Sequence, residues 1–375
     1  MTSLYLHIPF CKSKCPYCSF ASHPGFQNLH RRYTAALCME LEQLARDRQV
    51  PPLDTLFIGG GTPTVLGCED LTHILVLCHN LFGLQPDGEF SVEANPGTVD
   101  LNSLAALKAA GFNRLSIGVQ SFNQRELQVL GRSHTADEAI SAVEAAHEAG
   151  FSSLSLDLMY GLPNQTPEAW QDSLKTALSL PISHLSMYQL TIEDNTAFAH
   201  QYPPDSPLLP SEDESVQMDE INSRICSAHG FFQYEISNFS RAGEECRHNI
   251  NYWRNGDYSA AGAAAVSYLD GVRAKRIADP HSYCQAIESH VTAIEDQEQL
   301  ELEAAFRETV MLGLRMNRGV SFSELRQRFG IDARVYYGTT LLQLERTDCL
   351  EVKDDSLRLT DKGRLLANRV MAELI

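Results

Sequence analysis

Hydrophobic and polar positions form two kinds of segment through the first half of the chain. Short apolar runs have the length of buried strands, and each of the first five is followed by a stretch with apolar residues at helical spacing. The predicted strands cover residues 4–9, 55–61, 89–96, 114–120, 152–163 and 184–191. Strands that alternate with helices in this way predict an α/β fold, in which a parallel sheet is wrapped by helices.

The pattern changes after the sixth predicted strand. Residues 203–216 are rich in proline, serine and acidic side chains, and we expect a surface loop there. In the last part of the chain, Ser321 is followed three residues later by Glu324, which is the signature of a helix start. The elements predicted there are helices at 306–316, 321–330 and 341–348, a hairpin at 349–360 and a last helix at 361–374.

This order of helices, hairpin and helix predicts a small winged-helix-like α+β domain. Its arginines are scattered rather than massed, which favours a docking or lid role over DNA binding. We therefore divide the chain into a barrel domain at 1–235, a connecting region at 236–299 and a C-terminal domain at 300–375.

Composition narrows the partners and the compartment. The 375 residues carry a formal net charge of -18, which opposes nucleic acid and direct adsorption to anionic lipid. The chain starts without a basic segment followed by a long apolar one, and no run approaches the roughly 20 apolar residues of a spanning helix. We expect a cytoplasmic protein, in which the ten cysteines are thiols or metal ligands rather than disulfides.

Three cysteines lie close together in HIPFCKSKCPYCSF, at Cys11, Cys15 and Cys18. Thiolates at this spacing suit zinc or an iron-sulfur cluster. Structural zinc normally takes four ligands in two pairs, and the sequence offers no second pair. Three cysteines would instead hold three irons of a cubane cluster and leave the fourth iron open.

Polar residues and glycines gather at the carboxyl ends of the predicted strands. They occur at 59–62, Glu93, Gln120 and Asp157. Barrel-type α/β proteins place their active sites at this end of the sheet. We therefore expect these residues and the cysteine loop to share one site.

CxxxCxxC after one strand and GGGTP after the next resemble the radical SAM superfamily, in which S-adenosylmethionine (SAM) binds the open iron of a 4Fe-4S cluster. YLHIPFC, IGGGTPT, VEANPGT, SIGVQSF and LDLMYGLP further resemble the oxygen-independent coproporphyrinogen III oxidases and their relatives. The resemblance implies a partial (β/α)6 TIM-like radical SAM barrel with a HemN-type C-terminal domain. It places contacts to SAM at Tyr5, Tyr17, Gly60, Gly61, Thr62, Glu93, Gln120, Arg132 and Asp157.

Two features resemble the HemW-type haem chaperones within that group rather than the oxidases. The oxidases carry a further cysteine two residues after the third, where this chain has Phe20. The stretch ECRHNINYW contains HNxxYW, which resembles the haem-binding motif of the chaperones and marks His248 as the haem ligand, with Cys246 as an alternative. Tyr252 and Trp253 would offer apolar surface to the porphyrin. A basic zone suited to haem propionates comprises Arg241, Arg247, Arg254, Arg273, Lys275 and Arg276.

The resemblance thus implies a haem chaperone that delivers haem to acceptor apoproteins, with respiratory, membrane-associated acceptors and peripheral membrane association among the options. The alternatives are a coproporphyrinogen III oxidase or related tetrapyrrole enzyme, and a zinc-binding scaffold. No catalytic residue is assigned, and a homodimer is one option for assembly. One departure stands out: relatives show a glycine-rich turn with a histidine after the haem motif, whereas this chain reads AAGAAAVSYL with Val266 at that place.

Overall fold

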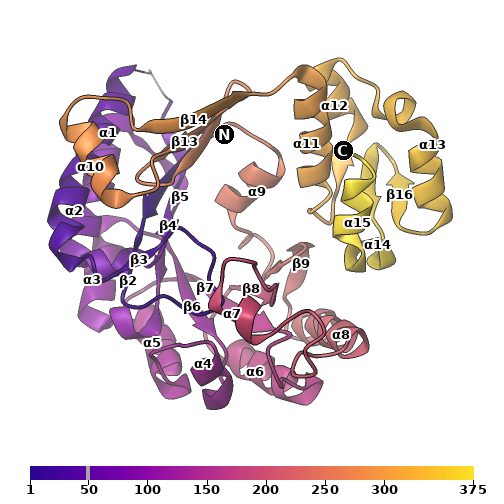
Figure 1. Ribbon diagram of the computed structural model, residues 1–375, viewed down its shortest axis with the longest axis horizontal. Coiled ribbons are helices and arrows are strands. Elements are labelled where there is room, and N and C mark those ends of the chain that lie inside the picture. Colours follow the sequence, from indigo (N-terminus) through magenta and orange to yellow (C-terminus); the bar gives the residue numbers. More distant parts are fainter. Residues whose placement is uncertain (48–50) are drawn as a thin grey trace.

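The computed structural model describes residues 1–47 and 51–375, and its centre is a nine-stranded sheet (Figure 1). The strand order is β11-β1-β4-β5-β6-β7-β8-β10-β9. Neighbouring strands from β11 to β8 run parallel, while β10 and β9 join the far edge antiparallel. The six predicted strands are confirmed as β1 (Ser3–Ile8), β4 (Leu53–Gly60), β5 (Leu84–Ala94), β6 (Arg114–Gln120), β7 (Ser153–Tyr160) and β8 (His184–Gln189).

Helices cover the outer side of this sheet, as the βα alternation predicted (Figure 1). Side chains fix where several of them begin: Asp100, Thr135 and Thr166 accept hydrogen bonds from backbone N–H groups of the first helical turn. Apolar faces of these helices pack on strands whose side chains are buried on both sides of the sheet. The helices are α1 (His30–Asp47), α2 (Cys68–Phe82), α3 (Leu101–Ala110), α4 (Gln124–Val129), α5 (Ala136–Glu148) and α6 (Pro167–Ser179).

The loop predicted at 203–216 is wrong in its second half, because helix α8 (Glu212–Ala228) begins there. Ser211 and Glu214 form a reciprocal capping box that starts the helix. This signal is present in the sequence, and the prolines before it obscured it. A short helix, α7 (Ala197–Gln201), precedes the loop.

The connecting region contributes to the sheet as well as to its surroundings. Strands β9 (Phe232–Glu235), β10 (Asn238–Ser240) and β11 (Ser259–Ala261) all belong to the large sheet, which therefore continues past the predicted boundary at residue 235. The division into three domains stays a prediction. The remaining elements are α9 (Arg247–Trp253), α10 (Pro280–Glu288) and an antiparallel sheet of β12 (Val266–Leu269), β13 (Val272–Arg276) and β14 (Ile294–Gln299).

The C-terminal part has its own apolar core, centred on residues such as Phe306 and Leu357. The predicted hairpin and the Ser321 cap are both confirmed, whereas the last predicted helix is broken at Leu366 into two. Its elements are α11 (Leu302–Gly313), β15 (Val320–Ser321), α12 (Phe322–Phe329), α13 (Ala333–Arg346), β16 (Leu350–Lys353), β17 (Ser356–Leu359), α14 (Asp361–Leu365) and α15 (Ala367–Ala372). In residues 1–47 and 51–375, no helix has the length and apolar character needed to span a membrane.

Candidate functional site

The cysteine loop leaves the carboxyl end of the first strand and is pinned where it begins and ends. Strand β2 (Phe10–Cys11) pairs with β3 (His23–Pro24), so the chain between them projects as one loop. All three thiols are free and half-buried. Burial raises the pKa of Cys11, and a hydrogen bond at 3.6 Å between its Sγ and Thr62 Oγ1 opposes that shift.

The three thiols of this loop are the type and number of donors that a cubane cluster with one open iron takes. Among the described residues, no three His, Cys, Asp or Glu side chains gather closely enough to hold one ion. A cubane has no such requirement, because each thiolate binds a different iron.

A cavity of about 360 Å³ opens beside this loop at the carboxyl ends of the parallel strands. Phe20, which is 68% exposed, also lines it. The structure thus brings together residues that lie far apart in the sequence, as the strand-end pattern predicted. The cavity is lined by these predicted site residues: Cys11, Cys15, Tyr17, Cys18, Gly60, Gly61, Thr62, Glu93, Gln120, Arg132 and Asp157.

Glycines allow the end of β4 to lie against the cysteine loop. A Cβ on Gly61 would stand 2.5 Å from the carbonyl oxygen of Phe10 and 3.0 Å from Cys11 Sγ. Gly60 has φ +119°, a conformation that other residues rarely adopt. Side chains at these positions would push the cysteine loop away, so the glycines are needed for the shape of the cavity.

Two carboxyl groups line the inner part of the cavity. Burial and the nearby charge of Asp157 raise the pKa of Glu93 to about 8, although the Gly60 N–H donates to its Oε2 at 3.1 Å. Burial also raises the pKa of Asp157, against the hydroxyl of Ser116, which donates to it at 3.1 Å. Two such groups favour a cationic ligand, since a positive charge would stabilise both carboxylates. The sulfonium and ammonium groups of SAM meet that requirement.

Arg132 links the cysteine loop to the strand ends. Its guanidinium donates to Asn95 Oδ1 at 2.5 Å, to the Gly118 carbonyl at 2.6 Å and to Cys15 Sγ at 3.6 Å. Asn95 in turn donates to Thr62 Oγ1 at 2.8 Å. Sequence reasoning missed Asn95, although it stands in VEANPGT directly after a strand that carries a predicted site residue.

Gln120 lies in the cavity wall in a strained conformation. Its φ is +71°, which side-chain-bearing residues adopt at a cost. Backbone strain of this kind is concentrated at ligand sites, where the surrounding structure holds it in place.

Tyr5 does not line the cavity, unlike the other predicted SAM contacts. Its hydroxyl lies 2.9 Å from His7 Nδ1, and His7 Nε2 lies 3.0 Å from the carbonyl oxygen of Ala21 at the end of the cysteine loop. His7 therefore connects Tyr5 to the cysteine loop.

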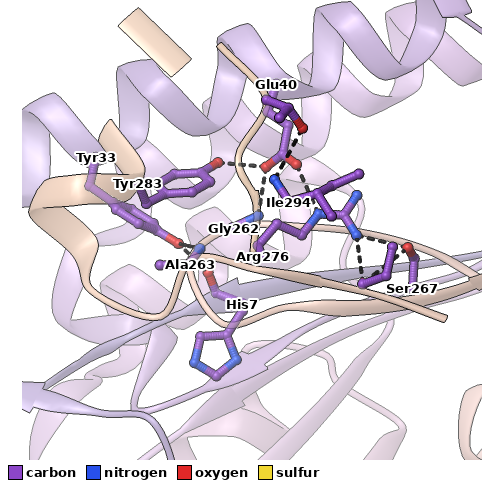
Figure 2. A network of polar contacts seen from close by, with 11 residues as sticks. His7, Tyr33, Glu40, Gly262, Ala263, Ser267, Arg276, Tyr283 and Ile294 are labelled. Carbon is purple, nitrogen blue, oxygen red and sulfur yellow. Dashed lines mark hydrogen bonds and ion pairs between the residues drawn. The ribbon is translucent and has the colours of Figure 1, made fainter. Parts of the chain in front are cut away.

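The turn that contains Gly262 and Ala263 packs against the first strand (Figure 2). Tyr33 donates to the carbonyl of His7 at 2.7 Å and accepts from the Ala263 N–H at 2.8 Å. Glu40 accepts from the Gly262 N–H at 2.8 Å, from the Tyr283 hydroxyl at 2.6 Å and from Arg276 Nε at 3.0 Å. None of the cavity-lining residues comes from residues 259–266 of the described chain. The turn supports β1 rather than the cavity wall.

His248 lies at the opposite end of the sheet, in α9, and its side chain is 0% exposed. Its Nδ1 lies 2.8 Å from Thr55 Oγ1, and its Nε2 lies 2.8 Å from the Tyr252 hydroxyl. Burial lowers its pKa to about 3, so the ring is neutral. Cys246 is 1% exposed and donates to Glu89 at 3.5 Å, and burial raises its pKa to about 12.

Within the predicted basic zone, Arg276 is not available to propionates, and the remaining cations stay a prediction. Arg276 is buried in an ion pair with Glu40, which is part of the hydrogen-bond network described above. Arg273 pairs with Glu308 and Glu298, and Lys275 with Glu295. Arg273 and Lys275 remain partly exposed in these pairs, whereas Arg276 does not.

A partial parallel barrel, a three-cysteine loop after its first strand and a cavity beside that loop at the strand ends define a radical SAM protein. Residues 5–177 match the radical SAM superfamily, and residues 300–366 match the HemN C-terminal domain. The heme chaperone HemW of Bacillus subtilis is 36% identical over all of this chain and 99% of its own length. HemW of Escherichia coli is 40% identical over 76% of this chain and 75% of its own. The chain belongs to the HemW family.

Coproporphyrinogen III oxidase (HemN) from Escherichia coli is also similar in structure. It superimposes with a TM-score of 0.87 and 26% identity, covering 100% of this chain and 89% of that one. The predicted α/β radical SAM fold with its C-terminal domain is confirmed.

Proposed function

We propose that this protein is a haem chaperone: it binds a 4Fe-4S cluster and SAM in the cavity, binds haem through His248, and passes haem to acceptor apoproteins. The observation that carries the proposal is the similarity, over the full length of the chain, to proteins named heme chaperone HemW. Phe20 supports it, since a phenyl ring stands where the oxidases have a further thiol and a ring cannot replace a thiol in metal or radical chemistry.

Within the proposal, Cys11, Cys15 and Cys18 hold the cluster. When bound, the cluster supplies an open iron for the amino and carboxylate groups of SAM, and an electron. Thr62 and Arg132, which already contact the thiols of Cys11 and Cys15, would stabilise their thiolates.

The other cavity residues would hold SAM. Glu93 and Asp157 accept from its hydroxyl or ammonium groups, and the amide of Gln120 both donates and accepts. Tyr17 offers a ring to the adenine. Gly60 and Gly61 allow the methionine part to approach the backbone, whereas Tyr5 acts through His7.

The second candidate is an oxygen-independent coproporphyrinogen III oxidase or a related tetrapyrrole enzyme. The structural match to HemN and the intact SAM cavity favour it. It requires productive cleavage of SAM in a protein that carries Phe20 in place of the further cysteine.

Anaerobic reconstitution with iron and sulfide, followed by parallel assays, separates the two functions. We expect haem to move from the loaded protein to an apo-haem protein, and we expect no decarboxylated product from coproporphyrinogen III with SAM and reductant. Cys11→Ala is the control for the cluster, and His248→Ala for the haem ligand. Product formation together with failure of haem transfer would favour the oxidase.

The family supports haem and haem-accepting proteins as partners in general. We further propose acceptors in the respiratory chain at the membrane, and a cytoplasmic protein that reaches them through peripheral contact. A homodimer is the assembly we propose to test by sedimentation at several concentrations. The acidic net charge of -18 supports the absence of nucleic acid among the partners.

A further inference from the structure

Both ring nitrogens of His248 are engaged in the described structure, in a way that fixes the tautomer. Thr55 Oγ1 donates its hydroxyl proton to Ser3 Oγ at 2.9 Å, so it accepts from His248 Nδ1–H. The Nε2 lone pair is then left to accept from the Tyr252 hydroxyl. A haem iron would need that lone pair, since Nδ1 carries the proton. Tyr252 therefore occupies the position at which the iron would bind.

Helix α9, which carries both residues, is anchored at its amino end by the barrel. The carboxylate of Glu89 on β5, which is 9% exposed, accepts from the backbone N–H groups of Arg247 at 2.9 Å and His248 at 3.0 Å. A buried carboxylate with two such partners holds the first turn of the helix firmly.

The carboxyl end of α9 is anchored by the C-terminal domain. Arg328 on α12 donates to the carbonyl of Arg254 at 3.1 Å and to that of Asn255 at 2.6 Å. The guanidinium of Arg315 lies 4.5 Å from the centre of the Trp253 ring. Figure 1 shows α9 between the sheet and α11, so the helix is fixed to both parts of the molecule.

We propose that this arrangement is a closed form of the haem site, in which Tyr252 and Arg328 are positioning residues that control access to His248. The proposal rests on the proposed role of His248 as haem ligand. Haem binding then requires the Tyr252 hydroxyl to leave Nε2 and α9 to move away from the sheet, because a fully buried imidazole cannot reach the iron of a porphyrin. The C-terminal domain holds the closed form through Arg328 and would release it when it shifts.

Apparent affinity is the intrinsic affinity multiplied by the fraction of molecules in the open form. Tyr252→Phe removes one hydroxyl and keeps the ring. One hydrogen bond of the closed form is lost, so we expect haem to bind roughly 2- to 10-fold faster and tighter. Tyr258→Phe is the matched control, since its ring packs on Tyr252 at 4.5 Å and the change leaves the His248 contact intact. Stopped-flow measurement of the Soret band gives the association rate.

Arg328→Met tests the second anchor. We expect roughly a 3- to 10-fold faster haem association, because the carbonyls of the two residues that follow α9 lose their partner. Arg326→Met is its control: Arg326 lies on the same helix but pairs with Asp332 within the C-terminal domain. Circular dichroism confirms that each variant is folded.

His248→Ala alone and combined with Tyr252→Phe makes the outcomes distinguishable. Loss of the haem spectrum in both, with faster binding in Tyr252→Phe and Arg328→Met, supports the closed form. A second outcome is loss of the haem spectrum in His248→Ala together with haem association in Tyr252→Phe and Arg328→Met that is unchanged or slower. This outcome overturns the closed form but still supports His248 as the haem ligand. An unchanged spectrum in His248→Ala overturns both the ligand and the closed form, while the transfer assay tests the chaperone function separately.

Discussion

At the scale of single residues, the cavity is defined by side chains whose properties come from their neighbours. Nothing in the sequence around Glu93 indicates an unusual pKa, yet burial and the nearby charge of Asp157 raise its pKa to about 8. The sequence identified this residue by motif and by its place at a strand end. It could not give the pKa, because the second carboxyl group lies 64 positions away in the chain (157 − 93) and meets it only in the sheet.

The raised pKa predicts that SAM binding releases a proton. Below about pH 8 the free site holds a proton on Glu93, and a cationic ligand favours the carboxylate and lowers that pKa. Affinity for SAM should therefore rise between pH 6 and pH 8 and level off above it, as roughly expected for one group with this pKa. Calorimetry at pH 7 in two buffers of different ionisation enthalpy measures the proton directly. Glu93→Gln should bind more weakly and lose this proton release, and affinity that stays constant over the pH range would contradict the prediction.

At the scale of elements, a buried polar network joins α1, α10, β13 and the turn before β12. Glu40 receives three hydrogen bonds there, including one in its ion pair with Arg276 (Figure 2). The sequence predicted the helix and the turn but assigned Arg276 to a haem surface. The sequence pattern shows that a strand carries a charged residue. It does not show which face of that strand is buried against other elements.

Arg276→Met should lower the free energy of unfolding by about 3 kcal/mol, because it leaves a buried carboxylate without its counter-charge. Lys275→Met, one residue earlier on β13, removes an exposed ion pair with Glu295 and should cost less than about 1 kcal/mol. Urea unfolding followed by circular dichroism measures both. If Glu40→Gln combined with Arg276→Met cost the sum of the two single changes, the ion pair would not be the source of the effect.

At the scale of the whole molecule, α9 contacts β4 of the large sheet and α11 of the C-terminal domain, and these two elements belong to different apolar cores. Every residue that lines the SAM cavity lies between Cys11 and Glu193. The C-terminal domain contacts Trp253 through Arg315 and the two residues after it through Arg328, but it does not line that cavity. The residues that line the cavity and the residues that contact the end of α9 therefore come from different parts of the chain.

Phe306→Ala separates these parts. Phe306 is 0% exposed and packs on Phe329, Tyr336 and Tyr337, so its loss should destabilise the C-terminal core by about 3–5 kcal/mol. Limited proteolysis should then cut within residues 300–375 sooner, while SAM affinity of the reconstituted protein stays unchanged. An affinity for SAM that falls in step with the proteolysis would show that the two parts are coupled.

The sequence by itself determined the strand–helix order, the three-cysteine loop, the glycines beside it and the family, because each depends on local spacing. Only the tertiary structure decided that Tyr5 is hydrogen-bonded to His7, that the 259–266 turn supports β1, and that His248 is hydrogen-bonded to Tyr252. These facts depend on which side chains meet across the sheet and between the two cores. Burial and hydrogen bonding between distant residues set them, and no local pattern encodes such contacts.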